Sequence, residues 1–588
     1  MIVEMRKVYI VARNPDSDRL LNCIRDLGVM HLSPVEPAKA VPDEKTITRI
    51  KNIEHALQVL SNIAAEDQAP DISVDQAAQT ILDIQRRLAE RQSRLVALHR
   101  ELEQLRIWGN VELTQFEQLH KAGLDVQFFS VPTKEVGEID AECVEVISNL
   151  PAKRSLVAVI DRRGQPRFPE SAQTIPLPQR DAPSIRAEAA EIDSAIKNDA
   201  DYLSRLAGMT DKMKAEHTKL LQQADYIIAL RGASDSEHLF AVQGWVPAEK
   251  GESLTAGLAG ADIDAAVRIL DPDPDDQPPT LVRYPSWTKP IEGLFKILGS
   301  VAGYREFDVS ASFMIALPIF AAMLISDGGY GIILFMVPLL LYKKVSNMFG
   351  RQFTHLLIVV GAVSLIWGLL CGSFFGTVLY APPIPVDLSR QSRVLVMKLS
   401  FVLGAIHLSI AQIWRAVALY PNLRFLNRLG WALFIWGMLG VVLFFVLASP
   451  MGWNTPWPYF LVIGAALVIV FACPSRKIHK MLGLGIADFP LSALSAFSDV
   501  ISYVRLMAVG LASSVLATNF NQMALDTGTW PLMLVILLLG HGLNIGLALI
   551  ALFAHGVRLN MLEFSSNLGM QWTGYPYNPF LKRTIQEY

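Results

Sequence analysis

Hydrophobic and polar positions follow two different patterns along this chain of 588 residues. Up to about residue 285, charged and apolar residues are mixed throughout, as they are in soluble proteins. Beyond Arg305, long stretches carry no charged side chain. The Pro/Asp-rich run 271–280 lies just before this change and predicts a linker, because it cannot sustain a helix or a strand ladder. The pattern predicts a cytosolic domain, an approach to the membrane and a membrane domain, with boundaries at 1–280, 281–308 and 309–588.

Two segments of the cytosolic domain have helical periodicity but too few apolar residues for a globular core. In the arms 45–108 and 185–232, apolar residues recur at spacings of three, four and seven, with charged residues at the outer positions. The segment 110–180 between them contains short β-branched and aromatic runs, which predict strands. We therefore expect a cytosolic α+β domain built on a long antiparallel coiled-coil hairpin, with a lobe at its tip. The alternative is a coiled coil that pairs with a second copy of the chain.

A second lobe is expected nearer the membrane, where strand-like stretches occur within 1–40 and 235–270. No glycine-rich phosphate loop, nucleophile elbow or zinc motif occurs in the cytosolic domain, so we expect no ATP site and no cofactor. The four cysteines show no paired ligand spacing, so neither a metal site nor a disulfide framework is expected. A net charge of −3 argues against a nucleic-acid partner.

Eight stretches of the membrane domain are apolar enough to cross a lipid bilayer, which takes about 20 residues. Two of them share the stretch from Val309 to Tyr342, where the one charged residue, Asp327, predicts the turn. The other six are 355–380, 395–420, 429–448, 457–473, about 486–520 and about 531–563. The last two are longer than the bilayer is thick, so we expect them to tilt steeply against a curved partner.

Basic residues in the short loops predict the orientation, because cytoplasmic loops are enriched in lysine and arginine. With the N-terminus inside, where the lack of a signal peptide also places it, the cytoplasmic loops and tail hold ten such residues against two in the opposite loops. The ten are Lys343, Lys344, Arg351, Arg424, Arg428, Arg476, Lys477, Lys480, Lys582 and Arg583. Both termini are expected in the cytoplasm.

Arg505 lies inside a predicted span, where a guanidinium costs about 2.5–3.5 kcal/mol on insertion scales. At about 100° per residue, Ser498 and Ser502 share its face of the helix and form a polar stripe. Arg558 closes the final span, with Asn544 and His555 on its face. Snorkelling to lipid headgroups is an alternative role for Arg558, whereas about fourteen residues follow Arg505 before its helix ends. An arginine at such a depth is a candidate functional residue.

Several segments together resemble subunit a of the V/A-type rotary ATPases, called subunit I in bacteria. The segment 498–512 (Ser-Asp-Val-Ile-Ser-Tyr-Val-Arg-Leu-Met-Ala-Val-Gly-Leu-Ala) resembles that family's arginine-bearing helix. The segments 540–544 and 555–564 are similar to its last span, and 317–331 to its first membrane hairpin. In the soluble half, Gln-Gly-Trp-Val-Pro at 243–247 resembles a family signature. The likeness runs from about residue 240 to the C-terminus and more weakly through the arms.

The resemblance implies a stator subunit that forms two ion half-channels against a rotating proteolipid ring. Arginine suits this role because it stays charged when partly desolvated and lowers the pKa of a carboxylate beside it. The other implied partners are peripheral stalk subunits, a central-stalk cap subunit and the lipid bilayer. ATP chemistry would belong to other subunits. The implied location is the plasma (inner) membrane of a prokaryote, crossed several times.

Two groups of residues are candidates for the ion path. The first comprises Arg505, Arg558, Glu563, His555, Asn544, Asp499, Ser502 and Ser498. The second comprises Asp327, His407 and His541, where a turn residue or a hydrogen-bonded span histidine is an alternative explanation. The sequence departs from the eukaryotic pattern at Ala548 and Ser513, where a glutamate and a histidine are expected. A proton path copied from the eukaryotic members is therefore not expected.

Two other functions compete with this prediction. A secondary transporter with a regulatory cytosolic domain would show internal repeats and matching broken spans in two halves. No such pairing occurs, since both intramembrane arginines fall in the last two spans. A purely structural membrane anchor would leave Arg505 unexplained.

Overall fold

The structure is a computed structural model. It describes residues 1–66, 69–108, 112–161, 166–235, 238–261, 263–387, 389–472 and 478–582. Arg476, Lys477 and Arg583, which belong to the predicted cytoplasmic loops and tail, lie outside these residues, as does Cys473.

The N-terminal lobe is an antiparallel sheet in the order β2-β8-β1-β9, with β7 also paired to β8. Its strands are β1 Met5–Arg13, β2 His31–Ser33, β7 Ser234–Asp235, β8 Leu239–Pro247 and β9 Ala265–Leu270. Val8, Ile10 and Ala12 alternate with less buried residues along β1, so one face of the sheet is apolar. Helices α1 (Ser17–Leu27) and α7 (Gly251–Gly260) bury that face.

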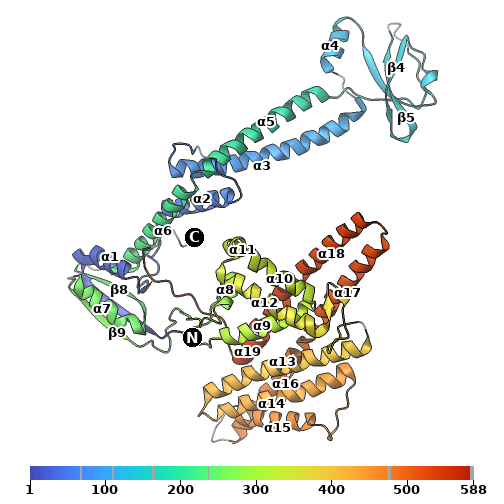
Figure 1. Cartoon of the computed structure of the whole chain (residues 1–588). Helices are drawn as coiled ribbons and strands as arrows, with labels where there is room; N and C mark the ends of the chain where they lie inside the picture. The colour runs from blue at the N-terminus through green and yellow to red at the C-terminus, as the bar shows by residue number, and fades with distance from the viewer. Residues whose placement is uncertain are drawn as a thin grey trace.

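Four helices connect this lobe to the distal end of the cytosolic domain. They are α2 Glu44–Leu60, α3 Val74–Gln104, α5 Ala182–Ala207 and α6 Thr210–Gly232. The long helices α3 and α5 run side by side in opposite directions (Figure 1). Ile81 and Ile84 of α3 share an apolar core with Leu203 and Leu206 of α5. Further along, Arg94 Nε lies 2.7 Å from Glu188 Oε1 across the pair. The helices fall where the arms are predicted, and their coiled-coil character stays a prediction.

The distal lobe is a four-stranded antiparallel sheet in the order β4-β5-β3-β6. Its strands are β3 Val126–Pro132, β4 Cys143–Leu150, β5 Arg154–Ile160 and β6 Gln173–Thr174, and α4 (Leu113–Lys121) lies beside it. Trp108, at the end of the first arm, packs edge-on against Phe128 with ring centroids 4.9 Å apart. This contact attaches the lobe to the tip of the long helices (Figure 1).

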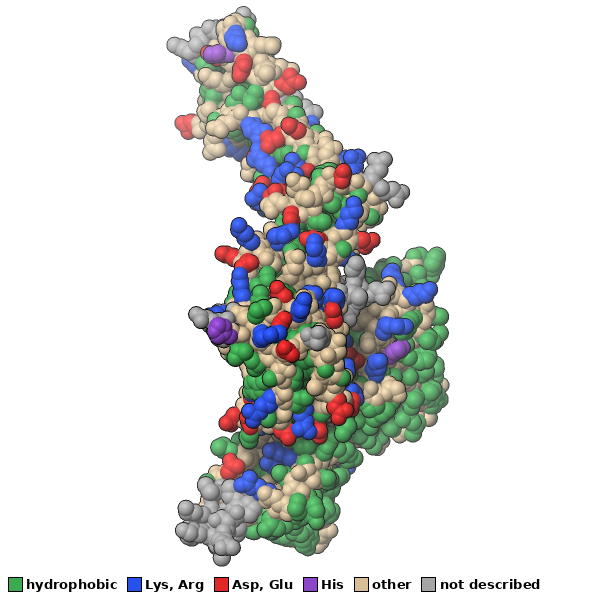
Figure 2. All heavy atoms as spheres, turned by 90° about the vertical axis from the view of Figure 1, so that its left-hand side faces the viewer, with side chains coloured by type: hydrophobic (Ala, Val, Ile, Leu, Met, Phe, Trp, Pro, Cys, Tyr) green, Lys and Arg blue, Asp and Glu red, His purple; other side chains and the backbone are tan. Residues whose placement is uncertain are grey.

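The membrane domain consists of helices with short connections. In chain order they are α8 Pro290–Leu298, α9 Ser310–Ile325, α10 Gly328–Leu340, α11 Tyr342–Phe349, α12 Arg351–Cys371, α13 Arg390–Leu419, α14 Arg424–Leu447, α15 Trp457–Phe471, α16 Ile478–Ser502, α17 Val504–Asp526, α18 Trp530–Ala551 and α19 Ser565–Leu568. Two π-helical stretches, Leu552–Val557 and Leu559–Phe564, join α18 to α19. Figure 2 shows hydrophobic side chains covering this domain, whereas charged side chains are spread over the cytosolic domain.

Five helices in the described part are long and apolar enough to cross a membrane: 351–371, 390–419, 424–447, 485–526 and 530–568. Helices α10 and α11 pass the same test only together, with a bend of 91°, and α9 and α15 are shorter apolar helices. Apolar helices thus lie at all eight predicted places, while the count of eight spans stays a prediction.

Three predicted span details are wrong. The span predicted to reach Tyr380 ends at Cys371, because Gly372 adopts a left-handed conformation (φ 65°) and a short β-hairpin follows. The last span runs past residue 563 to Leu568 through the π-helical stretches. The polar stripe around Arg505 presumed one unbroken helix, whereas the helix is interrupted at Tyr503.

Candidate functional site

Arg505 forms an ion pair with Glu563 inside the membrane domain. Its Nη2 donates to Glu563 Oε1 at 2.5 Å, and the two side chains are 21% and 7% exposed. Glu563 Oε2 is buried and has no hydrogen-bond partner among the described residues. A buried carboxylate oxygen without a partner is uncommon and calls for a functional explanation. In this pair the guanidinium of Arg505 remains partly exposed, and the carboxylate of Glu563 has one oxygen without a hydrogen bond in the described part of the chain.

The interruption at Tyr503 holds the guanidinium in place. Because Leu506 N donates to the carbonyl of Tyr503 at 3.1 Å, the carbonyl of Ser502 is free for another donor. Arg505 Nε donates to that carbonyl at 2.9 Å. Tyr503 is fully buried, and its hydroxyl lies 2.8 Å from His407 Nδ1 on α13. The break in the helix thus supplies both an acceptor for Arg505 and an anchor for its backbone.

Glycine at position 404 allows Tyr503 to approach α13 this closely. A Cβ atom added at Gly404 would lie 2.4 Å from Tyr503 Cγ, closer than real Cβ atoms come to such neighbours. The predicted candidate His407 therefore acts on the site through Tyr503. Its ring also stacks on Phe564, with centroids 4.5 Å apart.

Glu563, Arg558 and His555 lie on the π-helical part of the last span. Arg558 Nε is 3.8 Å from Glu563 Oε1, but its side chain is 56% exposed. His555 is half-buried on the same stretch. Wide turns of this kind occur frequently at functional sites, and they shift side chains out of the ordinary helical register. The structure brings Arg558 toward the ion pair but leaves it far more open than Arg505.

Asp499 and Glu563 are linked through Asn567, which the sequence analysis did not single out. Asn567 Nδ2 donates to Asp499 Oδ2 at 2.8 Å and to the carbonyl of Glu563 at 2.7 Å. Gln412 Nε2 donates to Asn567 Oδ1, also at 2.8 Å. We call Arg505, Glu563, Asn567, Asp499 and Gln412 the arginine network.

The arginine network borders a polar cavity of about 330 Å³. It opens among α13, α14, α15, α16 and α19, and its lining includes Gln412, Asn427, Arg428, Asp488, Ser492, Ser495, Asp499 and Asn567. Of these, the sequence analysis proposed only Asp499 as a site residue. The sequence feature that could have identified the other lining residues is the recurrence of polar residues near the ends of predicted spans, such as Asn427 and Asp488.

A second cluster surrounds the buried hydroxyl of Tyr330. Asn544 Nδ2 donates to Tyr330 Oη at 2.9 Å and to the carbonyl of Ser513 at 2.9 Å. His541 Nδ1 lies 2.8 Å from the same hydroxyl, and His541 Nε2 lies 3.0 Å from Asn521 Oδ1. We call these five residues the tyrosine network. It contains the predicted candidates Asn544 and His541 and adds Tyr330 and Asn521, whereas Ser513 was noted in the sequence only as a departure.

The side chains of the remaining predicted candidates have other partners or are exposed. Asp327 is buried and accepts hydrogen bonds from Tyr330 N at 3.1 Å, Ser373 Oγ at 2.9 Å, and the backbone N–H groups of Phe375 and Gly376 at 2.9 Å. With these four donors, Asp327 caps the start of α10 and holds the hairpin that follows α12. Ser502 Oγ donates to the carbonyl of Asp499 at 2.7 Å. The side chain of Ser498 is exposed, so it does not join the network. No group of three or more potential metal ligands occurs within the described ranges.

Comparison with known proteins gives one consistent result. No family model matches the chain. The V-type ATP synthase subunit I of Borreliella burgdorferi is 27% identical, over 99% of this chain and 100% of its own length. Subunit I 1 of the V-type ATP synthase of Treponema pallidum has the same identity and the same coverage of both chains. The A-type ATP synthase subunit I of Methanocaldococcus jannaschii is 25% identical over 59% of this chain and 55% of its own.

One similar solved structure is described as the cytoplasmic N-terminal domain of subunit I, homolog of subunit a, of V-ATPase. The match covers 45% of this chain and all of that one, at 15% identity, and its TM-score of 0.19 is too low to carry an argument.

Proposed function

This chain belongs to the subunit I family of V-type and A-type ATP synthases, and from that premise we propose that it forms the ion half-channels of the complex. It is the membrane subunit of a rotary ATPase, and the relatives give no support to a secondary transporter. The observation that carries the proposal is the Arg505–Glu563 pair, a charged pair set among apolar spans.

The ion pair is proposed to act by exchange of carboxylates. A proteolipid ring presents one acidic side chain after another, and each competes with Glu563 for the guanidinium of Arg505. An opposite charge lowers the pKa of a carboxyl group, so the ring site releases its ion as it meets Arg505. Arg505 remains charged throughout because a guanidinium does not lose its proton in proteins. After the ring site moves on, Glu563 pairs again with the guanidinium and balances its charge until the next ring site arrives.

The polar cavity beside Asp499 is proposed as the half-channel on the cytoplasmic side. Its rim includes the start of α14, where Arg424 and Arg428 belong to the predicted cytoplasmic loops. From the cavity, Asp499 and Asn567 lead to Glu563 through hydrogen bonds. Buried polar groups in such a line are favourable only when a partner or water satisfies each of them, which a hydrated cavity provides.

The tyrosine network is proposed to line the opposite half-channel. Ser513 lies eight residues beyond Arg505 on α17, about 12 Å along the helix axis. Asn521, at the far end of the network, approaches the loop predicted to face the other side of the membrane. The two polar regions lie on opposite sides of Arg505 and share no residue. Under this proposal, an ion that enters one of them can therefore reach the other only on the ring.

The outward face of α18 is the surface proposed to contact the ring. Leu538, Leu539, Leu543, Leu547 and Ile550 are between 45% and 70% exposed. Helices α17 and α18 project beyond the rest of the membrane domain (Figure 1). In the last span, only 17% of an 18-residue apolar stretch is buried. Exposed apolar surface of this extent requires lipid or a protein partner.

The cytosolic domain is proposed to bind peripheral stalk subunits through its two lobes, and the N-terminal lobe to approach the central-stalk cap subunit. A stator must resist torque from the catalytic head, and a long helical pair with a lobe at each end offers two separate attachment points. ATP is bound by other subunits under this proposal, and both termini lie in the cytoplasm of a prokaryotic cell.

The decisive experiment replaces the guanidinium while leaving the complex assembled. We expect Arg505→Gln to abolish ATP-driven ion uptake into reconstituted vesicles, and Arg505→Lys to impair it severely, because an ammonium differs in reach and hydration. Uptake is normalised to complex assembled with ring and stalk proteins. Near-normal uptake by Arg505→Gln would reject the proposal.

A further inference from the structure

The C-terminal segment returns from the membrane domain to the N-terminal lobe. After α19, Gly574 N donates to the carbonyl of Val301 at 3.2 Å, and the carboxylate of Glu306 accepts the backbone N–H of Gln571 at 2.5 Å. The segment then pairs with the linker, where Thr280 N donates to the carbonyl of Tyr575 at 2.8 Å. The chain is therefore held at several points before it reaches the lobe.

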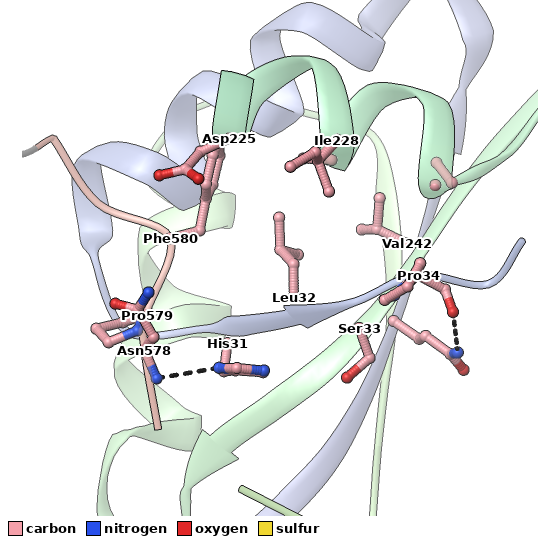
Figure 3. A pocket seen from close by; sticks show the side chains of 14 residues that line it. His31, Leu32, Ser33, Pro34, Asp225, Ile228, Val242, Asn578, Pro579 and Phe580 are labelled. Atoms are coloured by element: carbon pink, nitrogen blue, oxygen red, sulfur yellow. Dashed lines mark hydrogen bonds between the residues drawn. The ribbon is translucent and has the colours of Figure 1, made fainter. Parts of the chain in front are cut away.

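At the lobe, the segment attaches to strand β2 and the residues just before it. Figure 3 shows Asn578 and Phe580 beside β2, with the hydrogen bond from Asn578 N to His31 Nδ1, which is 3.0 Å long. Phe580 N donates to the carbonyl of Met30 at 2.8 Å. Tyr577 Oη donates to the carbonyl of Val29 at 2.5 Å. Burial holds the pKa of His31 below its ordinary value, which keeps the imidazole neutral as an acceptor.

An apolar anchor accompanies these hydrogen bonds. Phe580 is 8% exposed and belongs to the same core as Val8, Ile24 and Val242 of the lobe. Leu581 reaches Gly28, where an added Cβ atom would lie 3.2 Å from Leu581 Cβ. Lys582 Nζ lies 2.7 Å from Asp26 Oδ1 at the surface, where an ion pair adds little. The segment thus completes the lobe's core and does not merely lie on its surface.

We propose that residues 575–582 are a clasp that fixes the N-terminal lobe to the end of the last membrane span. The lobe and the membrane domain are also joined by the linker 271–280, which forms no helix or strand, and by contacts of the first residues of the chain. Ile2 pairs with Val282, and Met5 N donates to Tyr304 Oη at 3.0 Å. Short irregular connections of this kind allow a domain to pivot, and a further connection with a buried apolar anchor restricts that motion. The clasp follows the last membrane helix, which carries Glu563 and ends at Leu568, so it connects the cytosolic arm to the helix of the ion site.

The mechanical role of the clasp rests on the proposed stator function, whereas its existence does not. The structural test is a cross-link in the assembled complex. In a background without native cysteines, Asp26→Cys with Lys582→Cys is treated with a short bifunctional maleimide. We expect near-complete cross-linking within the chain, both at rest and during ATP turnover, with transport retained. Failure to cross-link in an otherwise native chain would overturn the proposal.

A second experiment loosens the clasp. Phe580→Ala with Tyr577→Phe removes the apolar anchor and one hydrogen bond. We expect a clear loss of cross-linking and a several-fold fall in ions transported per ATP hydrolysed. Ile269→Ala is the matched control, because Ile269 is 38% exposed on β9, at the opposite edge of the same sheet. Normal coupling in a variant that no longer cross-links would refute the mechanical role.

The two proposals fail in different ways. If Arg505→Gln transports normally, the ion-path proposal falls, and the cross-link still tests the clasp. If the variant with Phe580→Ala and Tyr577→Phe does not assemble, the cross-link between Cys substitutions at Asp26 and Lys582, made without these two changes, still tests whether the clasp exists.

Discussion

Most residues of the arginine network and of the tyrosine network lie on the last two spans, 485–526 and 530–568, but the two networks are built differently. The arginine network holds two carboxylates and a guanidinium, borders a cavity of about 330 Å³, and leaves Glu563 Oε2 without a partner among the described residues. The tyrosine network has no carboxylate or guanidinium, and Tyr330 and Asn544 are at most 1% exposed. In it, each ring nitrogen of His541 has a partner.

This contrast shows how two polar clusters in a membrane domain serve different needs. A buried hydrogen-bonded cluster without carboxylates gains little from rearranging, since each opened bond costs desolvation. A charged cluster with an incomplete hydrogen-bond set is ready to exchange partners. We therefore expect changes in the arginine network to act mainly on transport, and changes in the tyrosine network to act first on packing.

The largest effect is expected from Glu563→Gln. Removing one partner of a buried ion pair costs about 3–5 kcal/mol, because the other charge stays buried and uncompensated. We expect ion uptake to be lost and the detergent-solubilised complex to dissociate at a lower temperature. Glu563→Asp is the control, since it keeps the charge on a shorter side chain and should retain part of both. Uptake by Glu563→Gln equal to that of the unmodified complex would remove the carboxylate from the mechanism.

Gly404→Ala should be the next most severe change. The new methyl group would meet the Tyr503 ring and push the helix break away from α13. Because Arg505 takes its acceptor from that break, we expect uptake to fall strongly although no polar group is altered. Gly483→Ala on α16 is a matched control, as a Cβ atom there meets nothing within 4 Å. Equal uptake by the two variants would show that the break does not position the arginine.

Tyr330→Phe should have an intermediate effect. It leaves Nδ1 of the partly buried His541 without its partner Tyr330 Oη, whereas Asn544 keeps its bond to the carbonyl of Ser513. A buried group left without its partner costs about 1–3 kcal/mol, which should appear as a lower dissociation temperature with partial uptake. If uptake instead disappears while thermal stability is unchanged, the tyrosine network takes part in ion transfer directly.

Arg558→Gln should have the smallest effect of the four. Arg558 Nε is 3.8 Å from Glu563 and the side chain is 56% exposed, so solvent and headgroups screen most of the interaction. We expect reduced but measurable uptake under conditions in which Arg505→Gln shows none. Equal loss in the two variants would mean that the arginines work as a pair.

Sequence patterns were enough to locate the apolar helices and the turn at Asp327. A run of about 20 apolar residues is a local property, because every backbone group in lipid must be satisfied within its own segment. The same reasoning singled out Arg505, since a guanidinium among apolar residues is unusual in any fold. The resemblance to the family added Asp499 and Glu563 to the candidates, and the helical wheel added Asn544, but neither could say which of these residues pair.

The break at Tyr503 shows where local reasoning stops. The segment around Arg505 has the composition of one continuous span, so its face was predicted from a regular wheel. The helix is interrupted because Tyr503 packs against Gly404 and His407, which are about a hundred residues away in the chain. The side chain of Ser498 is exposed, and the carbonyl of Ser502 is the acceptor for Arg505 Nε.

What the sequence by itself determined is therefore the division into a charged cytosolic part and an apolar membrane part, with one arginine at an unfavourable depth. Each of these depends on residues that are neighbours in the chain. The tertiary structure decided that Arg505 pairs with Glu563, that Asn567 links it to Asp499, and that Phe580 returns to the N-terminal lobe. Those contacts join residues far apart in sequence, and they form only because many distant side chains pack at once, so no local pattern encodes them.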